Sequence, residues 1–229
     1  MTTVMVSQSN YLPWKGYFDL VRRADVLVLL DNVQFTRRDW RSRNMIKTSH
    51  GVQWLSVPVR TPNGRRTSVS EAEISDAGWA KSHLRAIKLS YGRTPHFAEV
   101  FELLLEILDA REVLLSHLNE RVLRGLLQFM GIDVQVRTTR GPIQEVNPSG
   151  RILNLVQGYG GTRYLSAPAA RSYLDVERFA DAGIIVDFLD YPDYPEYAQV
   201  WPPFRHDVSI VDVLFHLGSN WSFALGDRA

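Results

Sequence analysis

A continuous apolar run at residues 26–30, VLVLL, constrains the fold more than any other feature of this sequence. Apolar side chains without alternation are typical of a strand that is covered on both faces, as the strands of parallel sheets are. A shorter β-branched stretch lies at residues 3–6, and residues 15–23 place apolar side chains on one face of a helix. The chain therefore opens as a strand–helix–strand unit, which predicts two parallel strands.

The remainder of the chain continues this alternation around a helical middle. We expect further strands at residues 52–59, 133–137, 162–166 and 184–189. We expect helices at residues 79–91, 98–108, 113–130, 152–157 and 171–182, and a last helix that begins with Asp207 as N-cap and ends at Leu217. Residues 190–204 are rich in proline and aromatic residues and are expected to form a loop.

The predicted fold class is thus α/β, with a mostly parallel sheet, flanking helices and a helical block in the middle of the chain. The prediction is one domain over residues 1–229, with a helical subdomain at about residues 78–131.

The charged residues are unevenly distributed, although 26 Lys and Arg almost balance 25 Asp and Glu. Residues 36–66 contain eight basic residues against one acid, Asp39, so this segment carries +7 and the rest of the chain −6. A segment of this kind attracts anions. Because the rest is acidic and no nucleic-acid-binding motif occurs, we expect a small phosphate-bearing molecule as partner, with nucleic acid as a minor alternative.

Several classes of protein are excluded or disfavoured by what the chain lacks. It contains no cysteine, which excludes disulfides, thiolate metal sites and thiol catalysis. No run of 18 apolar residues occurs, so we expect no membrane span. The first ten residues do not have the pattern of a secretory signal, and we therefore expect a cytoplasmic location. The sequence does not predict the oligomeric state.

The loop after the first strand is the first candidate site. Gln8, Asn10, Tyr11 and Trp14 fall there, ahead of a helix N-terminus that favours anions. Ligands of open parallel sheets bind at the carboxyl ends of the strands, which is where this loop is expected. The alternative is a turn whose aromatic side chains anchor the core.

Residues 31–44, DNVQFTRRDWRSRN, directly follow the second strand and form the second candidate site. Arg41 and Arg43 are two residues apart, which places both guanidinium groups on one side of an extended segment. Such groups suit a phosphate or carboxylate. Asp31 would be the nearest carboxylate for a general base or a magnesium ion. The alternative is a solvated basic loop.

The last helix carries a polar stripe of Ser209, Asp212 and His216 beside its apolar stripe. A serine nucleophile normally sits on a turn near oxyanion donors, so we expect a hydrogen-bonded stripe that faces a loop or substrate rather than a catalytic triad. The remaining histidines lack zinc-ligand spacing, and no phosphate-binding glycine motif occurs. Tyr91 and Tyr191 belong to a set of aromatic residues that would wall a pocket for a sugar or base, or else anchor the packing.

Seven short motifs are spread almost from end to end of the chain. They are QSNYLPWKGYFD at residues 8–19, AD at 24–25, DNVQF at 31–35, RN at 43–44, WLSVP at 54–58, YLS at 164–166 and SIVDVLF at 209–215 with Gly218 after it. In these motifs the chain resembles the WbqC-like family. The resemblance implies a bacterial protein of gene clusters for surface polysaccharides such as O-antigen, or for natural products, and a transferase activity.

Two positions depart from the family pattern. The family opens as HQPNY where this chain has SQSNY, so Ser7 stands in the place of a histidine. The family's usual asparagine near the end of the last motif is His216 here. If the lost histidine is catalytic in relatives, this chain uses another residue or has another role.

The hypothesis is a cytoplasmic transferase that uses a nucleotide-sugar, acyl or aminoacyl donor, with magnesium if the donor carries phosphate. The residues expected to act in it are Asp31 as general base, Asn10 and Gln34 to orient the substrate, Trp14 and Tyr17 to stack on a base or sugar, Arg41, Arg43 and Lys47 to hold a phosphate, and Gln8, Tyr11, Asn44, Tyr91, Ser209, Asp212 and His216 as further substrate contacts. The alternative hypothesis is a non-catalytic ligand-binding or scaffold protein with a degenerate pocket.

Overall fold

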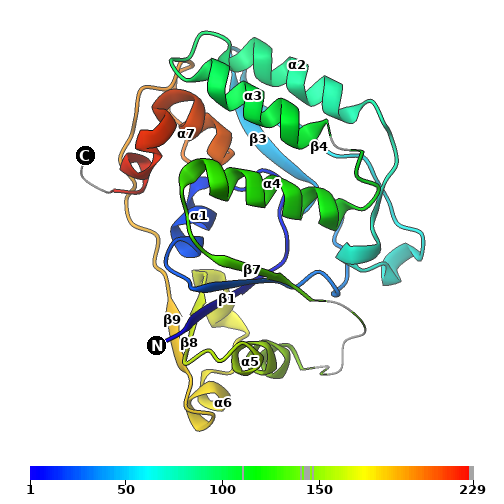
Figure 1. Ribbon diagram of the computed structural model, residues 1–229, viewed down its shortest axis with the longest axis vertical. Helices are drawn as coiled ribbons and strands as arrows, with labels where there is room; N and C mark the ends of the chain where they lie inside the picture. The colour runs from blue at the N-terminus through cyan, green and yellow to red at the C-terminus, as the bar shows by residue number, and fades with distance from the viewer. Residues whose placement is uncertain (110, 140, 142–144, 146, 227–229) are drawn as a thin grey trace.

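Five short strands form a parallel sheet in the computed structural model, which describes residues 1–109, 111–139, 141, 145 and 147–226. The strand order is β7-β2-β1-β8-β9, and every neighbouring pair is parallel (Figure 1). The strands are β1 (Thr3–Ser7), β2 (Val26–Leu29), β7 (Gln135–Thr138), β8 (Arg163–Ser166) and β9 (Ile185–Phe188). The protein is therefore α/β, as the continuous apolar run predicts.

Helices cover both faces of this sheet. Alternate side chains of each strand point to opposite faces, and both sets are apolar and buried. Val4, Val26 and Val28 lie in a core with α5 (Pro148–Gly158) and α6 (Val176–Asp181). Their neighbours, such as Leu27 and Leu29, belong to a larger core on the other face. That core includes side chains from α1 (Lys15–Val21), α2 (Trp79–Tyr91), α3 (Phe97–Leu108), α4 (Leu115–Met130) and α7 (Ile210–Leu217). The helical middle of the chain thus packs on the same core as the sheet (Figure 1).

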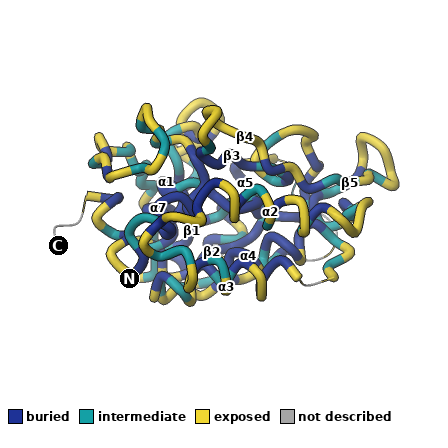
Figure 2. The backbone as a smooth tube through the Cα atoms, turned by 90° about the horizontal axis from the view of Figure 1, so that it is seen from above, coloured by how far each residue is buried: buried dark blue, intermediate teal, exposed yellow. Residues whose placement is uncertain are grey.

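The strand expected at residues 52–59 lies outside the parallel sheet. It is β4 (Gly51–Ser56), which forms an antiparallel hairpin with β3 (Arg43–Thr48). A second short pair joins β5 (Val59–Arg60) to β6 (Glu73–Ile74). In β4 every residue except Leu55 is exposed, whereas β3 is largely buried (Figure 2). The hairpin therefore presents one open strand on the surface of the molecule.

Two helix predictions are wrong in detail. The helix expected at residues 171–182 is a 3-10 helix, Pro168–Ser172, and a separate α6, whose N-cap is Asp175. The last helix begins at Ile210 with Ser209 as its N-cap, because Ser209 Oγ accepts from the Val211 amide at 3.4 Å. Asp207 does not cap it and instead forms an ion pair with Arg205.

Within the residues that the structure describes, no helix has the length and apolar character to cross a membrane.

Candidate functional site

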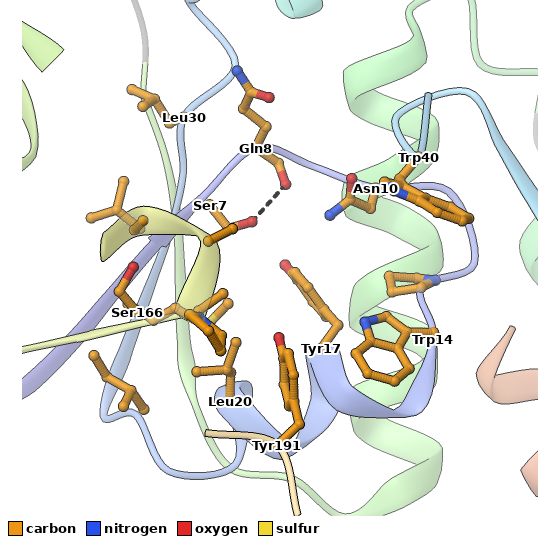
Figure 3. A pocket seen from close by; sticks show the side chains of 18 of the residues that line it. Ser7, Gln8, Asn10, Trp14, Tyr17, Leu20, Leu30, Trp40, Ser166 and Tyr191 are labelled. Atoms are coloured by element: carbon orange, nitrogen blue, oxygen red, sulfur yellow. Dashed lines mark hydrogen bonds between the residues drawn. The ribbon is translucent and has the colours of Figure 1, made fainter. Parts of the chain in front are cut away.

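A cavity of about 890 Å³ opens at the carboxyl ends of β1 and β8 (Figure 3). After β1 the chain continues to β2 and β7 on one side, whereas β8 and β9 lie on the other. Such a switch in strand order leaves a crevice in which α/β proteins bind their ligands. The polar and aromatic residues that line the cavity are Ser7, Gln8, Asn10, Trp14, Tyr17, Trp40, Arg41, Asn44, Tyr164, Ser166, Tyr173, Tyr191 and Asp207.

Buried polar side chains hold the loop that follows β1 against the cavity. Asp31 Oδ1 accepts a hydrogen bond from the Ser9 amide at 2.9 Å. Asn119 of α4 donates to Ser9 Oγ at 3.2 Å and to the Arg41 carbonyl at 2.9 Å. Asn44 donates to the Leu12 carbonyl at 2.7 Å. The loop and residues 41–44 are therefore fixed to one another, which places Gln8, Asn10 and Arg41 around the same cavity as the sequence predicts.

An aromatic wall closes one side of the cavity. The rings of Trp14 and Tyr191 meet edge to face with centroids 5.0 Å apart. The hydroxyl groups of Tyr17 and Tyr191 point toward the Ser7 end of the cavity (Figure 3). Tyr17 Oη is buried and has no hydrogen-bond partner among the described residues. Burial raises the pKa of Tyr17, with the nearby charge of Asp31 as the second cause and the Ser7 hydroxyl opposing the shift, so this phenol is a neutral donor for a ligand.

Among the described residues that line the cavity, every charged side chain has a partner ion. Of the lining residues only Arg41 and Asp207 are charged. Arg41 forms an ion pair with Asp39 through its Nη1 atom, while its buried Nε atom has no hydrogen-bond partner among the described residues. Asp207 accepts two hydrogen bonds from Arg205, at 2.7 and 2.6 Å. The remaining polar groups are amides, hydroxyls and indoles. Because a buried charge without a partner is costly, the cavity suits an uncharged group that stacks and forms hydrogen bonds.

Asp31 lies beneath the loop and does not line the cavity. Its side chain is fully buried, and its Oδ2 atom has no hydrogen-bond partner in the described part of the chain. Burial raises the pKa of this carboxyl, against the opposing effects of the Ser9 hydrogen bonds and the charge of Arg41. Asp31 therefore acts on the site through the loop that it holds.

A second buried polar cluster brings together three of the predicted residues, Tyr91, Asp212 and His216. The Asp212 carboxylate accepts from Tyr91 Oη at 2.9 Å, from Tyr197 Oη at 2.7 Å and from Gln199 Nε2 at 2.9 Å. His216 donates from its ring to the Asp212 carbonyl at 2.7 Å. Asp212 and His216 thus face the loop at residues 190–204, whereas the Ser209 hydroxyl caps the helix, and none of these side chains lines the cavity.

Four predicted contacts lie elsewhere. Tyr11 Oη is hydrogen-bonded to His83 Nδ1 at 2.9 Å in the core. Gln34 is exposed and pairs with Ser68 through an isolated bridge. Lys47 donates from Nζ to the Pro203 carbonyl. The guanidinium of Arg43 lies 4.1 Å from the ring centroid of Trp54. Arg41, Arg43 and Lys47 therefore do not converge on one phosphate in the cavity.

Lys15 was not among the residues predicted from the sequence, although it lies in the buried helix α1. Its Nζ atom is buried without a hydrogen-bond partner among the described residues, and the ring centroid of Tyr194 is 4.8 Å away. Burial lowers the pKa of this amine to about 8, while Asp212 and Glu196 oppose the shift. The signal in the sequence was a basic residue at the start of a short, mostly apolar helix.

Residues 166–170, which form a wall of the cavity after β8, were not predicted either. They contribute Ser166 and small apolar residues, and no motif marks them in the sequence.

Magnesium was expected only together with a phosphate-bearing donor. The described residues contain no group of three or more His, Asp or Glu side chains that could hold a metal ion.

The fold and the cavity define an α/β protein with a cavity at the carboxyl edge of a parallel sheet, at the switch in strand order where proteins of this class bind their ligands. The chain belongs to the WbqC-like protein family, whose sequence profile matches residues 8–222. It is 40% identical over 220 residues to the uncharacterized protein Rv1507c of Mycobacterium tuberculosis (strain ATCC 25618 / H37Rv), a match that covers 96% of this chain and 95% of that protein. No solved structure matches the chain.

Proposed function

We propose that the protein is a transferase that takes an uncharged group from an activated donor, with that group bound in the cavity at the ends of β1 and β8. The observation that carries this proposal is the pairing of both charged lining residues, Arg41 and Asp207, within the protein. A sugar ring or an acyl group fits such a cavity, whereas a phosphate group does not.

The lining residues divide into two kinds of contact for this group. Trp14 and Tyr191 present ring faces and edges on which a sugar or acyl chain packs. Tyr17, Gln8 and Asn10 provide hydrogen bonds that orient it. We assign to Asp31 the positioning of the loop after β1, and the proposal places no proton transfer on it. The family resemblance supports a role in bacterial polysaccharide or natural-product biosynthesis, and we place this role in the cytoplasm, where activated donors are made.

One observation favours the alternative of a non-catalytic binding protein. The buried hydroxyl of Tyr17 has no hydrogen-bond partner among the described residues, and its pKa is raised rather than brought toward neutrality. Such a phenol binds an acceptor atom well but is a poor general base at neutral pH. Ser7, which stands where relatives carry a histidine, also lacks a proton-transfer group and donates to the Gln8 carbonyl at 3.0 Å.

The two functions differ in whether the ligand is converted. Mass spectrometry of pooled nucleotide sugars, acyl thioesters and aminoacyl donors, incubated with the protein and candidate acceptors, should show loss of one donor and a matching product. Tyr17→Phe should reduce this turnover, because the ligand loses a buried hydrogen bond. The ring of Tyr159 packs against the core that contains α5, away from the cavity lining, so Tyr159→Phe should leave turnover unchanged. A ligand that is retained without conversion would establish the binding protein instead.

A further inference from the structure

Two exposed tryptophans and an arginine form a shelf at the rim of the cavity. Trp40 is 49% exposed and also lines the cavity. Trp54, on the open strand β4, is 41% exposed, and its ring centroid is 5.6 Å from that of Trp40. Arg43 stacks on Trp54 at 4.1 Å, and its Nε atom is buried without a hydrogen-bond partner in the described residues. We call Trp40, Arg43 and Trp54 the indole shelf.

The shelf has the opposite electrostatic character from the cavity. It lies within the segment of residues 36–66, which carries +7 in a chain of net charge +1. Unlike Arg41, Arg43 forms no ion pair with a carboxylate among the residues described, and its charge is stacked against an indole instead. A guanidinium held on an aromatic face keeps its terminal Nη groups free for the oxygens of a phosphate.

We propose that the indole shelf binds the nucleoside phosphate of the donor, with the base on the indoles and a phosphate on Arg43. This inference rests on the proposed function, because it places the anionic end of the donor outside a cavity that holds the uncharged end. Nucleotide sugars, acyl-coenzyme A and acyl adenylates all share a nucleoside phosphate. The shelf thus recognises the part that these donors have in common.

The ring geometry favours a base that lies on the shelf rather than between the two indoles. Insertion of a planar ring between two others requires centroids roughly 7 Å apart, twice an ordinary stacking contact. The observed 5.6 Å and the tilt of 36° leave no such slot. The exposed indole faces therefore form an open platform, on which a base stacks without selection for its identity.

Direct binding tests the shelf without any requirement for turnover. Wild-type protein is titrated with UDP and with ADP by calorimetry, and with uridine and adenosine as the matched uncharged probes. We expect both nucleotides to bind, the nucleosides to bind more weakly, and nucleotide affinity to fall as salt rises. Trp54→Ala should weaken nucleotide binding by about fivefold or more, and Arg43→Gln by about tenfold.

The controls are exposed residues of α2. Arg85→Gln removes an exposed arginine, and Leu89→Ala removes an apolar side chain that is 74% exposed; neither should change affinity. Trp54→Phe keeps an aromatic ring and should retain most of the binding.

Three outcomes would overturn the proposal: no nucleotide binding by the wild type, binding that Trp54→Ala and Arg43→Gln leave unchanged, or a dimer in sedimentation that Trp54→Ala dissolves. None of these decides whether a group is transferred, because the turnover assay measures that separately.

Discussion

Replacement of Gly16 by alanine tests whether the structure places the Trp14 ring correctly. Gly16 is the second residue of α1 and has an ordinary helical backbone. A Cβ atom there would lie 2.3, 2.6 and 2.7 Å from three carbons of the Trp14 ring. Carbon atoms normally approach to about 3.5–4.0 Å, so the ring would have to move by more than about 1 Å.

Two effects of opposite sign decide the magnitude. Glycine in a helix is less stable than alanine by about 0.5–1 kcal/mol, which favours the substitution. Overpacking typically costs about 1–3 kcal/mol, which opposes it. Trp14 is half-buried between Gly16 and the rings of Tyr191 and Tyr194, at centroid distances of 5.0 and 6.2 Å. We therefore expect Gly16→Ala to lower the free energy of unfolding by about 1 kcal/mol.

Urea unfolding measures this change, and near-ultraviolet circular dichroism reports the displaced indole. Gly158→Ala is the matched control, because Gly158 also lies in a helix and a Cβ there meets nothing within 4 Å. The control should raise the free energy of unfolding by up to about 1 kcal/mol. If Gly16→Ala stabilised the protein as much as Gly158→Ala does, the position of Trp14 over Gly16 would be refuted.

Three further substitutions test the buried polar groups. Burial lowers the pKa of His83 to about 4, so between pH 6.5 and 4 the unfolded chain takes up a proton that the folded protein does not. The free energy of unfolding should therefore fall by about 3 kcal/mol over this pH range. In urea unfolding, His83→Gln should show a smaller fall than the wild type. Asn119→Ala leaves Ser9 Oγ and the Arg41 carbonyl without their donor and should cost about 2 kcal/mol, measured by the same unfolding, with weaker ligand binding as the loop loosens. Asp212→Asn removes the carboxylate that accepts three hydrogen bonds, and we expect a loss of about 2–3 kcal/mol together with a lower pKa of Lys15 in amine titration by NMR; an unchanged Lys15 pKa would show that the two groups are not coupled.

The strands and helices were predictable where a local pattern defines them. The run at residues 26–30 is apolar because β2 is covered on both faces, and its burial is complete from Val26 to Leu29. The pairing of β1 with β8 joins Thr3 to Arg163, and no local pattern carries that information. This is why the sequence identified Gln8, Asn10 and Trp14 but not the wall after β8.

The two groups of candidate residues illustrate the same limit. Position after a strand predicts which edge of a sheet a side chain approaches, and it predicted Arg41 correctly as a neighbour of the first loop. It does not predict which partner a charge finds. Lys47 sits in β3 with its amine on the Pro203 carbonyl, and Asp212 turns toward Tyr197, because the loop at residues 190–204 folds back over both.

The distribution of charge over the folded chain is what links the cavity to the shelf. A segment with +7 suggests by itself that cations surround the bound ligand. In the fold, Arg41 at the cavity is neutralised by Asp39, whereas Arg43 at the rim rests on Trp54 without a carboxylate partner among the described residues. Among the described residues, the arginine at the mouth is therefore free of a carboxylate, whereas the arginine that lines the cavity is paired with one. A ligand that matches this distribution of charge has an uncharged end and an anionic end, which is the chemical form of an activated donor. A ligand without an anionic group would form no ion pair with Arg43.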